Sequence, residues 1–243
     1  MQITLEIDDG AARATKTFPI RRMYNLGSAT RKAETAVAHQ QEVAKEGIHI
    51  AFSVPAPRIY PIGVHALTSD REVHVQGTHT SGEVEIAILV ADQVYVGVGS
   101  DHTDRALERT SIPWSKQACP NVLAPTMWPL EAMRERWDDC VLRSWVDGRP
   151  YQDVSVAAFL HPDDVLRILK ERVAGLPARD FLVFCGTIVS LDKALGFGRT
   201  WRIEIEDPRG RRRVGHEYAV VNLFDEIREG FRVPIENPKA PAA

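Results

Sequence analysis

The sequence has few cysteines, no long apolar run and little excess charge. Its 243 residues contain three cysteines, an odd number without a CxxC pair, so neither a disulfide framework nor a zinc knuckle is expected. The longest apolar runs fall short of the about 20 residues that a spanning helix needs, and the start, MQITLEIDDG, has no signal-peptide core. A net charge of −3 attracts neither nucleic acid nor anionic membrane. We expect a reduced, soluble, cytoplasmic protein with neither as partner.

Alternating hydrophobicity dominates the sequence and predicts a sheet-rich fold. Strands are expected near residues 2–7 and 15–19, as antiparallel neighbours between 72 and 98, and in the last third at 181–191, 200–207 and 216–224. Helices are expected at about 28–46, with Ser28 as N-cap, at 129–141 and at 162–173. The chain is therefore predicted to be an α+β, β-rich protein with few helices.

A proline-rich connection after the first expected helix suggests how the chain is organised. Pro55, Pro57 and Pro61 follow that helix closely. We expect residues 1–50 to form a strand–helix appendage and residues 51–236 to form the main domain. The Pro/Ala-rich end, residues 237–243, is expected to be a flexible tail.

Two glutamates in the segment GEVEIAILV are the first candidates for chemistry. Glu83 and Glu85 are two residues apart in a predicted strand, so both project from one face while Val84 and Ile86 project from the other. Two adjacent carboxylates repel each other unless they face solvent or a cation neutralises them. That cation could be a lysine, an arginine or a divalent metal ion.

A third carboxylate ends the partner strand, in VGVGSDHTDRALE. The short turn Ala91-Asp92-Gln93 predicts a hairpin that would bring Asp101 near Glu83 and Glu85. A site of three carboxylates without cysteine favours a hard ion such as Mg²⁺, Mn²⁺ or Ca²⁺ over zinc. Asp101 is therefore a candidate metal ligand as well as a candidate turn residue.

These motifs resemble the fumarylacetoacetate hydrolase superfamily over about residues 58–206. That superfamily has a Glu-x-Glu strand, then an Asp-x-x-x-Arg turn, a downstream Lys and a late Gly-Thr. Here they are Glu83-Val-Glu85, Asp101 to Arg105, Lys116 in WSKQACP, and Gly186-Thr187 in FCGTIVS. More narrowly, TSGEVE, GSDHTDRALE, SKQACP and LRSW resemble an uncharacterised bacterial branch of it.

The resemblance implies a rolled mixed β-sheet that binds one Mg²⁺ or Mn²⁺ through Glu83, Glu85 and Asp101. It implies a homodimer and a small oxo-acid substrate that chelates the metal. Lys116 would supply a second cation for an oxyanion or a substrate carboxylate. Arg105 would either grip a substrate carboxylate or brace Asp101 and Glu85. Gly186 and Thr187 would offer a backbone N–H and a hydroxyl to a substrate oxygen.

Two departures from the superfamily pattern bear on the substrate and on the base. Glu108 stands where many members have Gln, and its charge would repel an acidic substrate, which favours an amide or neutral ligand.

The His–Glu pair that activates water on a mobile lid in many members has no readable match; the region YPIGVHALTSD offers His65 and Asp70. His65 and His79 are the candidate bases, and His102 is a candidate neighbour of the metal ligands. Cys119 could be a thiolate nucleophile or a buried apolar residue.

The favoured function is metal-dependent hydrolysis of a C–C bond, or a related C–N bond, in a small dioxo or 2-oxo acid or its amide. A decarboxylase, hydratase or tautomerase would need the same stabilisation of an enolate but no hydrolytic step. The remaining alternative is a non-catalytic small-molecule-binding protein, in which Arg or Lys neutralises the two glutamates.

Overall fold

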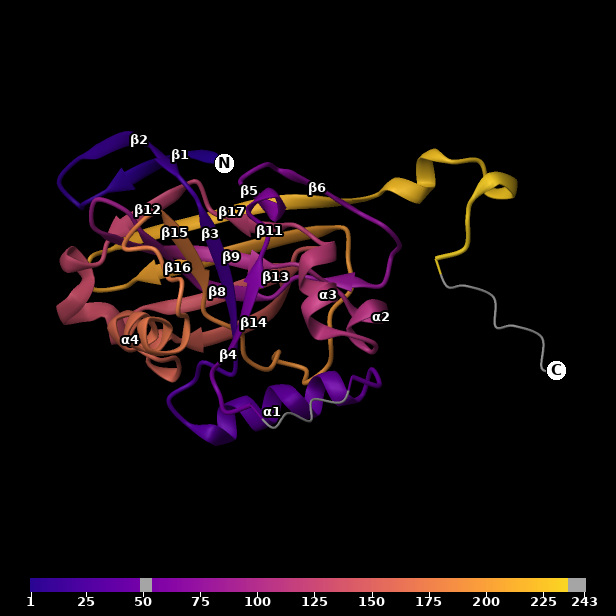
Figure 1. Cartoon of the computed structure of the whole chain (residues 1–243), viewed down its shortest axis with the longest axis horizontal. Coiled ribbons are helices and arrows are strands. Elements are labelled where there is room, and N and C mark those ends of the chain that lie inside the picture. Colours follow the sequence, from indigo (N-terminus) through magenta and orange to yellow (C-terminus); the bar gives the residue numbers. More distant parts are fainter. Residues whose placement is uncertain (49–53, 236–243) are drawn as a thin grey trace.

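Two β-sheets form most of the structure, a computed structural model that describes residues 1–48 and 54–235. In Figure 1 the strands occupy the middle of the molecule, one helix lies along its lower edge, and the C-terminal segment projects to the right. The fold is β-rich α+β with a curled half-barrel and few helices, as predicted.

The larger sheet has ten strands and carries the glutamate strand at its centre. In spatial order its main path is β2 (Arg13–Pro19), β1 (Gln2–Asp8), β12 (Thr126–Pro129), β9 (Val94–Asp101), β8 (Val84–Val90), β15 (Phe181–Phe184), β3 (Arg22–Gly27) and β4 (Arg58–Ile62). Off this path, β11 (Asn121–Leu123) pairs with both β9 and β5 (Leu67–Thr68). Because β8 is a central strand, both of its faces are buried.

The second sheet and a short ribbon complete the β-structure. The second sheet has the order β14 (Arg149–Ser155), β13 (Val141–Val146), β16 (Thr200–Asp207), β17 (Arg212–Asn222) and β6 (Glu72–Val75). The ribbon pairs β7 (Thr80–Ser81) with β10 (Thr103–Asp104). It ties the residues just before β8 to those just after β9, so the two ends of the hairpin are held together.

The helices are short and connect the strands. The α-helices are α1 (Ala33–Ala44), α2 (Arg105–Glu108), α3 (Ile112–Ala118) and α4 (Pro162–Arg172). The 3₁₀ helices are η1 (Val64–Ala66), η2 (Glu131–Asp139), η3 (Val156–Ala158), η4 (Leu223–Glu226) and η5 (Glu229–Phe231). Among the residues that the structure describes, no helix is both long and apolar enough to cross a membrane.

The hydrophobic core lies on both faces of β8 and fixes which way its side chains point. Ile86 and Ile88 pack in the cluster that also contains Trp128, Trp137 and the apolar residues of β16. Ala87 and Leu89 pack in the opposite cluster, with Phe184 of β15. The alternation predicted from GEVEIAILV is therefore present, and it sends Glu83 and Glu85 to the face opposite Ile86.

The predicted β8–β9 hairpin is confirmed, with Ala91–Gln93 at its turn. Val90 pairs with Val94, and Glu85 lies opposite Gly99. At the open end the N–H of Asp101 donates to the carbonyl of Glu83, 3.1 Å away. Asp101 therefore ends β9 on the same face as the two glutamates.

Three sequence-based expectations were wrong in detail. The strand at 72–75 pairs in parallel with β17 of the second sheet and is not a neighbour of β8. The first helix begins at Ala33, because residues 22–27 form β3 and Ser28 has a positive φ of 60° rather than a capping conformation. In the segment 181–191 only residues 181–184 are a strand, and the rest forms the loop that reaches the site.

The N-terminal strands are part of the larger sheet. β1 pairs in parallel with β12, and β3 lies between β15 and β4. The expected domain boundary at residue 50 and the expected tail at 237–243 lie outside the described residues. The division into an appendage and a main domain therefore stays a prediction.

Gly99 should be essential to the packing around the hairpin. An alanine Cβ there would lie 2.3 Å from Cε1 of Phe184 and 2.7 Å from the carbonyl oxygen of Val122. We expect Gly99→Ala to lower the free energy of unfolding by about 1–3 kcal/mol in urea titrations. Gly175→Ala is the matched control, because its Cβ would meet nothing within 4 Å. Equal stability of the two variants would contradict this account.

Candidate metal centre

Three buried carboxylates converge where β8 begins and β9 ends. Glu83, Glu85 and Asp101 each place one carboxylate oxygen within 4.8 Å of the others. All three side chains are nearly inaccessible to solvent. Their burial excludes the alternative in which the glutamates face water, so other groups must neutralise their charge.

Lys116 of α3 neutralises part of this charge. Its Nζ forms a short ion pair with Oδ2 of Asp101 and lies 3.8 Å from Oε2 of Glu83. The surrounding carboxylates raise the pKa of Lys116 despite its burial, so the ammonium stays charged. Oε2 of Glu85 accepts a hydrogen bond of 2.8 Å from the N–H of Gly186. Gly186 has a φ of +79°, and a Cβ there would lie 2.6 Å from the carbonyl oxygen of Leu26.

The remaining charge imbalance fits a divalent cation. Burial and the neighbouring Asp101 raise the pKa of Glu85 well above its usual value, and burial raises the pKa of Asp101 even with Lys116 beside it. Oδ1 of Asp101 is buried and has no hydrogen-bond partner within the described structure. Three carboxylates with one unpartnered oxygen suit a hard ion such as Mg²⁺ or Mn²⁺, whose charge would favour their ionised forms.

Arg105 of α2 braces Glu83 from behind. Its guanidinium is completely buried, with Nη2 2.8 Å from Oε1 of Glu83, Nη1 2.7 Å from Oε2 of Glu108 and Nε 2.6 Å from Oγ of Ser81. Burial opposes ionisation of Glu83, but Arg105 and Lys116 hold its pKa well below the usual value. Of the two roles expected for Arg105, these contacts fit the bracing of a site carboxylate. The carboxylate that Arg105 braces is that of Glu83, and not that of Asp101 or Glu85. Glu108 is already paired, so it repels an anionic ligand much less than its charge suggests.

His39 and Glu42 of α1 belong to the site and were missed in the sequence. Nε2 of His39 lies 3.4 Å from Oε1 of Glu83, and its Nδ1 lies 2.9 Å from Oε2 of Glu42. Burial opposes the charged imidazole, but the two carboxylates raise the pKa of His39 to about 9. The signal was present in HQQE, since a His and a Glu three residues apart share one face of a helix.

The other oxygen of Glu42 fixes the helix against the rest of the protein. Oε1 accepts a 3.0 Å hydrogen bond from the N–H of Ser190 and a short one from its hydroxyl. Val43 and Ile48 also pack on Leu195 in a small apolar cluster. The orientation of His39 is thus set by contacts at the back of α1, away from the carboxylates.

A small cavity joins these groups. Its volume is about 50 Å³, enough for an ion and one or two waters but not for a substrate. It is lined by the glutamates, Glu108, Lys116, Gly186 and Thr187, by His39 and Gln40 of α1, and by Arg58 and Tyr60 of β4. Since α1 supplies one wall, a shift of α1 would enlarge the cavity.

Of the other predicted site residues, Thr187 lines this cavity, whereas His65 and His79 do not. Thr187 lines it, but its hydroxyl donates to the carbonyl of Val84 and accepts from Nε2 of Gln152. His65 is exposed in η1 and contacts Gln117, and His79 stacks on Phe197 with Nε2 3.4 Å from Glu46. The structure therefore brings neither candidate base to the carboxylates.

His102 supports the site from a buried position behind Asp101. Its ring nitrogens lie 3.2 Å from the hydroxyl of Tyr218 and 2.9 Å from that of Thr80. Burial, reinforced by Arg105, lowers the pKa of His102 to about 3. It is therefore neutral at physiological pH and holds neighbouring strands together.

The three cysteines should be unreactive in the folded protein. All are buried, and burial raises the pKa of Cys119 and of Cys140 to about 12. A raised pKa keeps the thiol protonated, and the protonated thiol is a poor nucleophile. We expect iodoacetamide at mildly alkaline pH to leave the native chain unmodified and to label all three in denaturant, as read by mass spectrometry. Rapid labelling of native Cys119 would revive its role as a nucleophile.

Comparison with known structures supports the fold. A candidate fumarylpyruvate hydrolase from Burkholderia cenocepacia is 18% identical, with a TM-score of 0.60 over 91% of this chain and 96% of that one. A 5-carboxymethyl-2-hydroxymuconate delta-isomerase from Mycobacterium smegmatis is 15% identical, with a TM-score of 0.59 over 87% of each chain. These likenesses confirm the predicted fumarylacetoacetate hydrolase fold. No curated protein matches the chain.

A sequence family gives the more specific assignment. The profile of DUF2848, described as a protein of unknown function, matches residues 27–218, which include α1, the three carboxylates, Lys116 and the Gly-Thr loop. The match covers most of the chain. The protein therefore belongs to the DUF2848 family, whose fold in this chain is that of the fumarylacetoacetate hydrolases.

Proposed function

We propose that the protein is a divalent-metal-dependent hydrolase that cleaves a C–C bond, or a related C–N bond, in a small dioxo or 2-oxo acid or its amide. One observation carries the proposal: Glu83, Glu85, Lys116 and His39 border one small cavity, a carboxylate oxygen of Asp101 lies within 4.8 Å of those of the two glutamates, and Glu42 lies 2.9 Å from Nδ1 of His39. Hydrolysis needs a cation for the developing oxyanion and a base for water, and this cavity has candidates for both.

Glu83, Glu85 and Asp101 would hold Mg²⁺ or Mn²⁺. When bound, such an ion polarises a substrate carbonyl and stabilises the enolate that leaves when the bond breaks. Lys116 adds a positive charge on the same side of the cavity, where it can bind the substrate carboxylate or an oxyanion. Its contact with Asp101 is a direct ion pair, so the ammonium is held in place before substrate arrives.

His39 is the proposed base. Glu42 accepts from Nδ1 and so orients the ring, which leaves Nε2 directed toward the cavity to take a proton from water. Without a cation at the carboxylates, His39 is protonated at neutral pH, because its pKa is about 9. Part of that rise comes from Glu83, so ligation of a cation by Glu83 would lower the pKa of His39 and free the neutral imidazole.

Charge around the cavity is compatible with an anionic substrate. The carboxylates are Glu42, Glu83, Glu85, Asp101 and Glu108, and the cations are His39, Arg58, Arg105 and Lys116. A bound divalent cation that leaves His39 neutral would bring these charges into balance, so the net charge does not oppose a monocarboxylate. Since Arg105 neutralises Glu108, that residue is no argument against an acid.

The nearest alternative is an isomerase, decarboxylase or hydratase acting on a similar oxo acid. The fold is shared with a protein named as a delta-isomerase, and isomerisation or decarboxylation needs the enolate stabilisation without the water, whereas a hydratase adds water without cleaving the substrate. Cleavage of the substrate into two products, one of which carries label from ¹⁸O water, would identify hydrolysis, whereas a single labelled product would identify hydration and release of CO₂ would identify decarboxylation.

Calorimetric titration of chelator-treated protein tests the metal site. We expect Mn²⁺ and Mg²⁺ to bind with one-to-one stoichiometry, and Glu85→Gln and Asp101→Asn each to weaken binding at least about tenfold, because each removes one of three charged ligands. Glu204→Gln is the matched control, since Glu204 is also buried and ion-paired but lies in β16. Binding that survives both site changes would exclude this centre.

Substitution of the histidines tests the base. We expect His39→Asn to lower kcat by about 100- to 10,000-fold on an active dioxo acid, the range typical of a lost general base, while the metal still binds. His65→Asn and His79→Asn, which change the residues predicted from sequence, should retain full activity. Normal turnover by the His39 variant would overturn the assignment, and hydrolysis would then need another base.

A further inference from the structure

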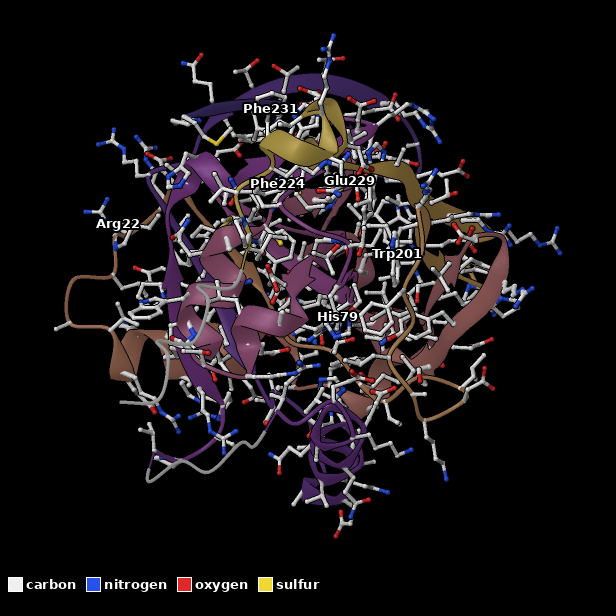
Figure 2. The ribbon with its side chains drawn as sticks, turned by 90° about the vertical axis from the view of Figure 1, so that its right-hand side faces the viewer. Arg22, His79, Trp201, Phe224, Glu229 and Phe231 are labelled. Atoms are coloured by element: carbon white, nitrogen blue, oxygen red, sulfur yellow. The ribbon has the colours of Figure 1, made fainter. Side chains whose placement is uncertain are left out.

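The start of β8 lies against the second sheet, on the side away from the cavity. A Cβ at Gly82, the residue before Glu83, would lie 2.6 Å from the hydroxyl of Tyr218 in β17 and 2.9 Å from Cε3 of Trp201 in β16. Val84 packs in the cluster that contains apolar residues of β13 and β16. Figure 2 shows the molecule from the right-hand side of Figure 1, with Trp201 right of the centre. The second sheet therefore supports the glutamate strand from behind.

Gln152 of β14 forms polar contacts across this interface. Its side chain is buried and uses all four of its hydrogen-bonding positions. Oε1 accepts from the N–H of Val84, 3.1 Å away, and from the hydroxyl of Ser144, 2.9 Å away. Nε2 donates to the hydroxyl of Thr187 and to the carbonyl of Ile188, both 2.8 Å away. Because these partners need an acceptor and a donor together, a carboxylate or an apolar side chain in this place would leave buried polar groups unpaired.

The bonds to Val84 fix the peptide between the two glutamates. The Thr187 hydroxyl that accepts from Gln152 donates in turn to the carbonyl oxygen of Val84, 2.9 Å away. The N–H and the carbonyl of Val84 are thus bonded to this pair of side chains. Since Val84 stands between Glu83 and Glu85, its backbone sets the directions in which the two carboxylates leave the strand.

The two bonds from Nε2 fix the loop that follows β15. At one end of this loop the N–H of Gly186 donates to Oε2 of Glu85. At its other end the N–H and the hydroxyl of Ser190 donate to Oε1 of Glu42, which orients the proposed base. Gln152 holds the loop between these two points. One amide group therefore supports both the segment that orients a metal ligand and the segment that orients the base.

We propose that Gln152 is a positioning residue of the metal centre, which sets the separation of Glu83 and Glu85 through the Val84 peptide and the Gly-Thr loop. This inference rests on the proposed metal site. Gln152 does not line the cavity, so its effect on a bound ion passes through other residues. Mg²⁺ requires near-octahedral ligands at short distances, whereas Ca²⁺ accepts variable geometry. Loss of the amide should therefore weaken Mg²⁺ binding more than Ca²⁺ binding.

Calorimetric titration of chelator-treated Gln152→Met with Mg²⁺ and with Ca²⁺ tests the proposal. Methionine has a similar length and no amide, so the variant loses the four hydrogen bonds without a change of charge. We expect the Mg²⁺ dissociation constant to rise at least about tenfold, as is typical when a residue that orients a metal ligand is replaced, and the Ca²⁺ constant to rise at most about threefold. Leu169→Ala is the control for lost stability, since Leu169 is also buried but lies in α4. It should leave both constants unchanged.

The wild-type titration separates this inference from the metal site on which it rests. Unchanged constants in Gln152→Met, or an equal rise for the two ions, would overturn the positioning role and leave the metal site in place. A wild type that binds neither ion would overturn the metal site and the positioning role together.

A pair of variants at Thr187 tests the same contact independently of how well Gln152→Met folds. Thr187→Val removes the hydroxyl that joins Gln152 to Val84, whereas Thr187→Ser keeps a hydroxyl there. We expect the valine variant to lose more affinity for Mg²⁺ than for Ca²⁺, and the serine variant to bind both ions as the wild type does. The same preference between the two ions in both variants would show that this hydroxyl does not position the glutamates.

Discussion

The fold is arranged around three carboxylates that are buried together. Glu83, Glu85 and Asp101 would repel one another in a medium of low polarity, and each neighbouring element supplies a group that lessens the cost. Arg105 comes from α2, Lys116 from α3, the N–H of Gly186 from the loop after β15, and His39 from α1. A purely structural cluster would be fully compensated, but Asp101 keeps an oxygen without a hydrogen bond. The neighbouring groups neutralise only part of the negative charge of the three carboxylates, and a bound divalent cation would neutralise the rest.

Local sequence predicted the centre of the site well, because its geometry depends on a single hairpin. The alternation in GEVEIAILV fixes the face of Glu83 and Glu85, and the short turn at Ala91–Gln93 fixes where Asp101 lies. Gly97 and Gly99 of β9 share that face and leave space for Met127 and Phe184. The two glycines in VGVGSD thus belong to packing, while the aspartate belongs to the site.

What the sequence did not predict depends on contacts between distant segments. His39 reaches Glu83 because Glu42 is fastened to Ser190, and no local pattern links HQQE to that loop. His65 was a candidate because its segment corresponds to the lid of the superfamily, and His79 because it precedes the Glu-x-Glu strand. Position in the sequence is a poor guide in a sheet where neighbours come from all parts of the chain. Glu108 was interpreted as an unpaired charge. Its ion pair with Arg105 depends on the short helix α2, which was not predicted from the sequence.

The strict alternation of β8 limits how this protein can diverge. Loss or gain of one residue between Glu85 and Val90 would turn Val84 and Ile86 toward the cavity and the glutamates toward the core, because strand side chains repeat every two residues. The centre would then vanish in one step, with no weakened intermediate. Length changes at the turn, Ala91–Gln93, would leave the alternation untouched. Surviving insertions should therefore accumulate at the turn of this hairpin and be absent from its strands.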